Sequence, residues 1–155
     1  MIPKSTTAEV PERIKQIIQQ NDIDALICRA EELADELVNE DLSNTQIRNV
    51  YASVKQVAHS GNPYERRRQI KMLLPRLTYA ANKDTANKKD ENQRGRQDEE
   101  GKLKKLTDEL IFCIRAMDAT DEATYREQFK RFSDFLEAIV AYHYRPSQRS
   151  SRKKR

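Results

Sequence analysis

Residues 43–83 decide how this chain folds, and they read SNTQIRNVYASVKQVAHSGNPYERRRQIKMLLPRLTYAANK. Ser43 and Gln46 stand three positions apart, which is the spacing of a capping box at the start of a helix. Gly61 is typical of a helix stop, and Pro63 suits the first turn of the following helix. The stretch therefore predicts two antiparallel helices.

Both predicted helices are amphipathic when their residues are placed at about 100° per residue. In the first helix the apolar face is flanked by a row of basic side chains, Arg48, Lys55 and His59. In the second helix a contiguous polar arc holds Arg67, Arg68 and Lys71, beside an apolar side made of Ile70, Leu73, Leu74 and Leu77. The hairpin is thus expected to present cations on a rigid surface, as binding to a polyphosphate backbone requires.

An alternative is that these cations only keep the helices in solution, because Arg and Lys commonly occupy exposed helix faces. Charge segregation favours a binding site instead. Residues 63–76 hold five basic residues and one acid, whereas the net charge of the whole chain is only +4.

The composition favours an all-α protein, since the 155 residues include only 3 Gly and 5 Pro and lack alternating β-branched runs. We expect one compact helical bundle of about five to six helices over residues 1–144. No apolar run has the length of a signal peptide or a membrane span, so the protein is expected to be soluble and cytoplasmic, without a membrane partner. Cys28, off the apolar face of its helix, and Cys113, at the edge of another, are interpreted as free thiols.

The flanking segments have distinct characters. Residues 8–42 carry ten acids and three bases over two predicted helices, 11–20 and 22–39, the second capped by Asp22 or Asp24. This acidic section is either a scaffold or a docking surface for a basic neighbour. Residues 82–102 hold six bases and six acids and few apolar groups, and they are expected to be a flexible insert.

The last two predicted helices, 103–117 and 122–144, complete the core. The second has the richest apolar face of the chain, with Tyr125, Phe129, Phe132, Leu136, Ile139 and Val140. His143 lies on that face, which favours a packed, hydrogen-bonded role over a catalytic one. Residues 145–155 add six basic residues and no acid, and they are expected to form a disordered tail that tethers polyanions or only aids solubility.

No pattern in the sequence assembles an active site. It lacks a Gly-rich phosphate loop, zinc-type Cys/His spacing and a Ser/His/Asp set that helical periodicity would bring together, and neither of its two histidines follows an Arg by four to six residues. We therefore predict no catalytic residue, no metal site, no cofactor and no enzyme activity.

Three blocks resemble a known family: SNTQIRNVY at residues 43–51, LLPRLTYAA at 73–81 and FSDFLEAIVAYH at 132–143. They are similar to the signature blocks of the small helical subunit of type III-A CRISPR-Cas (Csm) effector complexes. The family's basic positions match Arg48, Lys55 and Arg76. The chain has Asn82-Lys83 where the family usually has Gly-Arg, and Tyr144 where it usually has Lys.

The resemblance implies a non-enzymatic subunit, present in several copies, that stacks along the guide RNA paired with its target RNA and contacts other Csm subunits. Such a subunit must read phosphates and shape, because base readout would restrict which guides work, and cations without an aromatic platform suit that task. A stand-alone nucleic-acid-binding protein and a protein-docking adaptor remain as alternatives. The predicted RNA-binding residues are Arg48, Lys55, His59, Arg67, Arg68, Lys71, Arg76 and Lys83.

Overall fold

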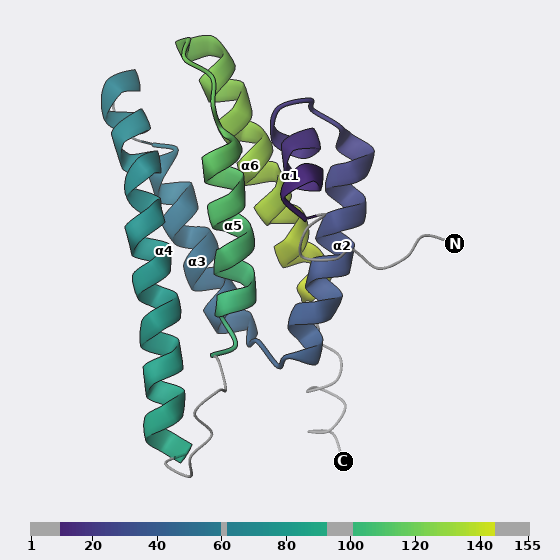
Figure 1. Cartoon of the computed structure of the whole chain (residues 1–155), viewed down its shortest axis with the longest axis vertical. Helices are drawn as coiled ribbons and strands as arrows, with labels where there is room; N and C mark the ends of the chain where they lie inside the picture. The colour runs from purple at the N-terminus through teal and green to yellow at the C-terminus, as the bar shows by residue number, and fades with distance from the viewer. Residues whose placement is uncertain (1–9, 60–61, 93–100, 145–155) are drawn as a thin grey trace.

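The computed structural model describes residues 10–59, 62–92 and 101–144, with the backbone alone for 85–92. This part of the chain consists of helices and the loops that connect them (Figure 1). It contains six helices: α1 (Val10–Ile18), α2 (Ile23–Asn39), α3 (Asn44–Val57), α4 (Pro63–Asn92), α5 (Lys104–Ala116) and α6 (Glu122–His143). The predicted all-α bundle is confirmed.

Helices α2, α3 and α4 begin at or next to the residues that the sequence predicts as their starts. The Ser43 hydroxyl accepts a hydrogen bond from the Gln46 backbone N–H at 3.0 Å, and the Gln46 side chain accepts one from the Ser43 N–H at 3.3 Å. Asp22, rather than Asp24, caps α2, and α4 begins at Pro63. The predicted stop at Gly61 lies outside the described residues, and α3 ends earlier, at Val57.

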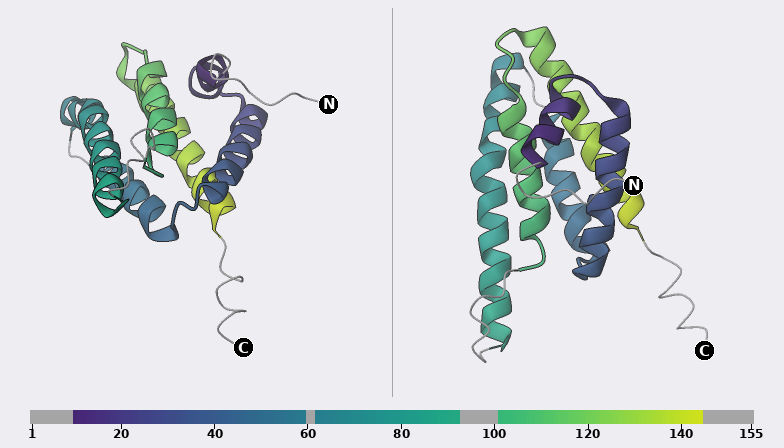
Figure 2. Two further views of the ribbon diagram at one scale, coloured as in Figure 1. Left: turned by 60° about the horizontal axis from the view of Figure 1, so that its bottom comes forward. Right: turned by 45° about the vertical axis from the view of Figure 1, so that its right-hand side comes forward.

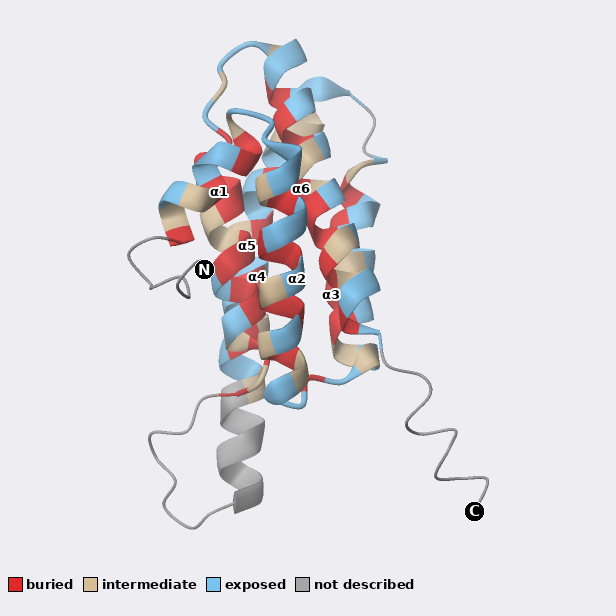
Figure 3. Ribbon diagram, turned by 90° about the vertical axis from the view of Figure 1, so that its right-hand side faces the viewer, coloured by how far each residue is buried: buried red, intermediate tan, exposed pale blue. Residues whose placement is uncertain are grey.

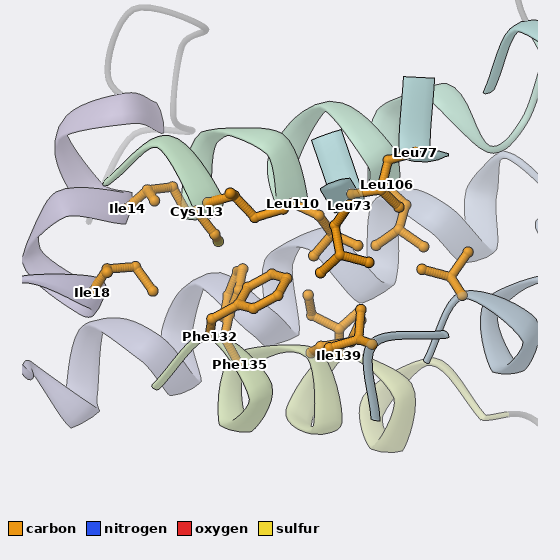
Figure 4. Close-up of a cluster of buried hydrophobic side chains, with 14 of the residues drawn as sticks. Ile14, Ile18, Leu73, Leu77, Leu106, Leu110, Cys113, Phe132, Phe135 and Ile139 are labelled. Carbon is orange, nitrogen blue, oxygen red and sulfur yellow. The ribbon is translucent and has the colours of Figure 1, made fainter. Parts of the chain in front are cut away.

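Helices α5 and α6 lie between two pairs of helices, α1 with α2 on one side and α3 with α4 on the other (Figure 2). Because α6 has neighbours on several sides, its buried surface is wider than one stripe. Phe135, which the single predicted apolar face omits, is fully buried beside Phe132 and Ile139 (Figure 4). These side chains point toward Leu73 of α4 and Leu110 of α5 and join the helices into one core.

His143 closes the bundle at the end of α6. Its ring is buried, and Nε2 lies 2.8 Å from the carbonyl oxygen of Leu42. A carbonyl can only accept a hydrogen bond, so Nε2 is the donor. The predicted structural role of His143 is confirmed: it joins α6 to the connection between α2 and α3.

Three predicted placements were wrong. Ile23 and Ile27, assigned to the apolar face of α2, are 56% and 42% exposed, because none of the described helices covers the outer side of the first turns of α2 (Figure 3). Cys113, expected at an edge, is fully buried, and burial raises the pKa of its thiol well above the usual value. Both cysteines are free thiols, as predicted.

Helix α4 is longer than the sequence pattern predicts, since it continues through residues 82–92, which belong to the segment 82–102 that we expected to be a flexible insert. After Pro75 no Pro or Gly occurs before Gly95, so nothing in this segment breaks the helix. The flexibility expected for the rest of the insert falls partly on residues 93–100, and that of the tail falls on residues 145–155, all outside the described part. None of the helices in the described ranges is both long and apolar enough to cross a membrane.

Candidate nucleic-acid interface

Seven of the eight predicted RNA-binding residues are exposed on α3, in the turn that follows it, or on α4, and the two helices lie side by side (Figures 1 and 2). They form two surfaces. The α3 stripe consists of Arg48, Lys55 and His59, and the α4 band consists of Arg68, Lys71, Arg76 and Lys83. Arg67 is the exception, because its side chain is half-buried and engaged within the protein.

The α3 stripe follows the edge of α3 that lies next to α6. The guanidinium carbon of Arg48 is 5.9 Å from the ring centroid of Tyr144, and Nζ of Lys55 is 5.8 Å from that of Tyr51. Burial raises the pKa of Asp134 on α6, and the positive charges of Lys130 and Lys55 partly offset this effect. Arg48, Lys55 and His59 are exposed and form no ion pair with any carboxylate that the structure describes.

The α4 band covers the solvent side of α4. Arg68 has a weak contact with Glu65, at 4.0 Å, and Lys71, Arg76 and Lys83 form no ion pair within the described residues. Arg76 and Lys83 are seven positions apart, which places them about 20° apart around the helix and about 10 Å apart along it. They therefore present two cations along one edge of α4.

Arg67 instead holds the bundle together. Its guanidinium carbon lies 3.7 Å from the ring centroid of Tyr125, and its terminal nitrogens donate to the carbonyl oxygens of Ala119 at 3.3 Å and Thr120 at 3.5 Å. These contacts tie α4 to the connection between α5 and α6. Arg67 therefore stabilises the fold, whereas its position in the basic arc of the sequence had suggested RNA binding.

A groove of about 330 Å³ separates the two surfaces, with α3 and α4 as its walls. Val50 of α3 and Leu73, Leu77 and Leu103 line it with buried apolar groups. Polar and charged side chains also line it: Gln46, Asn49, Ser53, Arg76, Lys83 and Asp84.

Tyr79 was missed by the sequence analysis, which expected no aromatic platform beside the cations. Its side chain lines the groove and is 66% exposed, between Arg76 three positions before it and Lys83 four positions after it. The spacing of three and four positions places all three residues on one face of a helix, and this pattern could have identified Tyr79 from the sequence.

The fold and these surfaces define the class: a small helical bundle that displays cations along two adjacent helices, most of them without an acidic partner among the described residues. A family model described as Csm2 Type III-A matches residues 20–149, from the connection before α2 to beyond the end of α6. The chain belongs to the Csm2 Type III-A family, so it is a small subunit of the type III-A Csm complex of CRISPR-Cas, as the three sequence blocks led us to expect. Comparisons with curated proteins and with solved structures returned no match.

Proposed function

We propose that this protein is a non-catalytic subunit that binds the backbone of the guide RNA paired with its target RNA, and that several copies help to build a filament. The observation that carries the proposal is the contrast between several paired basic residues elsewhere in the bundle and the cations of the α3 stripe and most of the α4 band. Several basic residues of α1, α5 and α6 have a carboxylate partner within 4 Å: Arg13, Lys15, Lys104, Lys105 and Arg126. Those of the α3 stripe have none in the described part of the chain.

The type of recognition follows from the chemistry of these surfaces. Contacts from Lys and Arg to phosphate oxygens carry no information about the base, so binding through such contacts is independent of sequence. The α3 stripe and most of the α4 band are set on helices that are packed into the core, so they meet a regular duplex without reorganising. A subunit used with any guide needs this property.

The affinity of a single copy is expected to be low. Each neutralised phosphate contributes a slope of roughly 0.7 to 0.9 in the logarithm of affinity against the logarithm of salt concentration. Three or four such contacts bind weakly at physiological salt. Several copies that occupy one RNA raise the overall affinity through effective concentration, without any new type of contact.

The test reverses two charges of the α3 stripe, Arg48→Glu with Lys55→Glu, and measures binding to several RNA duplexes over a range of salt concentrations. We expect about a tenfold loss of affinity, equal for all sequences, and a flatter salt dependence. The matched control, Lys15→Glu with Lys105→Glu, changes the net charge equally on α1 and α5. Equal affinity for both double variants would contradict the proposal.

A contribution to protein docking is a second candidate. Ile23 and Ile27 are exposed on α2, and the exposed acids Asp24 and Glu31 lie on the same side of that helix. An apolar strip with acidic neighbours suits a basic surface of another Csm subunit. Reversal of Asp24 and Glu31 to Lys is expected to reduce co-purification with the complex and to leave RNA binding intact. Unchanged co-purification would exclude this role.

A further inference from the structure

The groove between α3 and α4 has features that phosphate binding alone does not require. Phosphates need cations on an open surface, but here an exposed tyrosine ring, Tyr79, stands at the edge of a hollow lined by Val50, Leu73 and Leu77. A large aromatic group left mostly in water beside an apolar hollow is a candidate contact for a flat apolar partner. The hollow thus offers room for a group that stacks on the ring.

The basic residues around the Tyr79 ring indicate that the partner carries negative charge. Arg76 and Lys83 follow the same edge of α4 on either side of Tyr79, and both are exposed. The acid of the groove, Asp84, is engaged: it accepts from Nε2 of Gln46 at 3.2 Å and from the backbone N–H of Leu103 at 3.0 Å. The groove therefore has a net positive rim around an aromatic platform.

The wall formed by α3 adds hydrogen-bonding groups. The side chain of Asn49 is exposed and forms no hydrogen bond with the residues described, so its amide and carbonyl are available to a ligand. A carboxamide of this kind can pair with the edge of a nucleobase. Ser53 donates to the backbone carbonyl of Asn49 at 3.2 Å and supports this turn of α3.

The groove is held in shape before any ligand arrives. Asp84 links α4 both to the start of α3, through Gln46, and to the residue preceding α5, through Leu103. A site that is already formed loses less conformational entropy on binding. Its volume of about 330 Å³ lies at the lower end of the range for pockets that hold one small organic group.

We infer that this groove binds one unpaired nucleotide of the RNA, with its base stacked on Tyr79 and its flanking phosphates near Arg76 and Lys83. The inference rests on the proposed function and extends it, because a base within a duplex is stacked and paired and cannot enter the groove. An unpaired base is free to stack on the ring. The exposed base edge then meets Asn49, while the backbone stays on the basic rim.

The experiment compares two RNAs with the full-length protein at low ionic strength, by fluorescence anisotropy. One is a fully paired duplex, and the other is the same duplex with a single unpaired nucleotide in its centre. We expect the wild type to bind the second RNA at least about fivefold more tightly, since a base stacked on an aromatic ring contributes this much or more. Tyr79→Ala is expected to reduce that ratio to about one, and Tyr79→Phe, which keeps the ring, to preserve it.

Tyr64→Ala supplies the matched control, because Tyr64 is also an exposed tyrosine of α4, at 79%, and lies outside the groove. It is expected to keep the wild-type ratio. A wild-type ratio of one, or a ratio unchanged in Tyr79→Ala, would overturn the inference and leave the backbone-binding proposal standing. Absence of binding to both RNAs would overturn both.

Discussion

Arg29 of α2 donates two hydrogen bonds to the carboxylate of Glu109 of α5, with Nε 2.6 Å from Oε2 and Nη2 2.9 Å from Oε1. Both side chains are buried, at 3% and 4% exposure for the two residues. Burial lowers the pKa of Arg29, but the hydrogen bond and charge of Glu109 outweigh it and raise the pKa above its ordinary value. The arginine therefore remains charged within the core and fixes α2 against α5.

Removal of one partner of this pair should be costly. Glu109→Gln keeps the size of the side chain but leaves the buried guanidinium without its main counter-charge, so we expect a loss of about 3 kcal/mol in the free energy of unfolding. Urea denaturation measures this loss. The exposed Glu127→Gln serves as control, and the apolar double variant Arg29→Met with Glu109→Leu is expected to recover most of the stability. A loss below about 0.5 kcal/mol in Glu109→Gln, within the range of surface substitutions, would show that the pair is dispensable.

A second prediction concerns acid stability through Glu32. Burial raises the pKa of this carboxyl, but hydrogen bonds and charges from Arg13 and Arg29 lower it below its usual value of 4.5. A folded-state pKa below the unfolded one stabilises the protein above the unfolded pKa, and this stabilisation is lost as pH falls through the folded pKa. The urea midpoint of Glu32→Gln should therefore lie below that of the wild type at pH 7, and the gap should narrow at about pH 3.

The control for Glu32 is its neighbour Glu31, which is exposed and forms no ion pair within the described residues. Glu31→Gln is expected to leave the urea midpoint unchanged at both pH values. A gap between Glu32→Gln and the wild type that stays constant from pH 7 to pH 3 would exclude the electrostatic explanation.

Arg67 and Arg68 are adjacent in sequence but should differ in their effects. Arg67→Gln removes the stacking on Tyr125 and weakens the bonds to the α5–α6 connection, so we expect a loss of about 1–2 kcal/mol in unfolding free energy. Arg68→Gln should change stability by less than about 0.5 kcal/mol and should weaken RNA binding. Thermal unfolding and RNA titration of both variants provide the measurement. Equal stability of the two would argue against the structural task of Arg67.

The basic tail gives a fourth prediction. Deletion of residues 145–155 removes six basic residues and no acid, so the nonspecific affinity for RNA should fall and its salt dependence should flatten. Circular dichroism should show the same cooperative thermal transition, because the described core ends with α6. Loss of this transition would mean that the tail contributes to folding.

The sequence by itself predicted the helices, their caps and the family. Local signals determined these features: Ser43 with Gln46 begins α3, Pro63 begins α4, and the apolar period assigns a buried side to each helix. These signals act over a few residues and need no knowledge of neighbours. The family predicted from three sequence blocks is also confirmed. Each block is a short run of neighbouring residues, so it can be recognised without the tertiary structure.

Only the tertiary structure decided which sides of each helix are covered and what the charged residues do. Arg29 and Glu109 occupy apolar-phase positions of two helices that are distant in sequence, and their pairing depends on how α2 meets α5. Arg67 stacks on Tyr125 and so does not join the exposed basic residues, and Ile23 and Ile27 stay exposed because none of the helices in the described ranges packs against them. Helical periodicity fixes the direction of a side chain around its own axis, but its environment is set by packing between elements far apart in the chain.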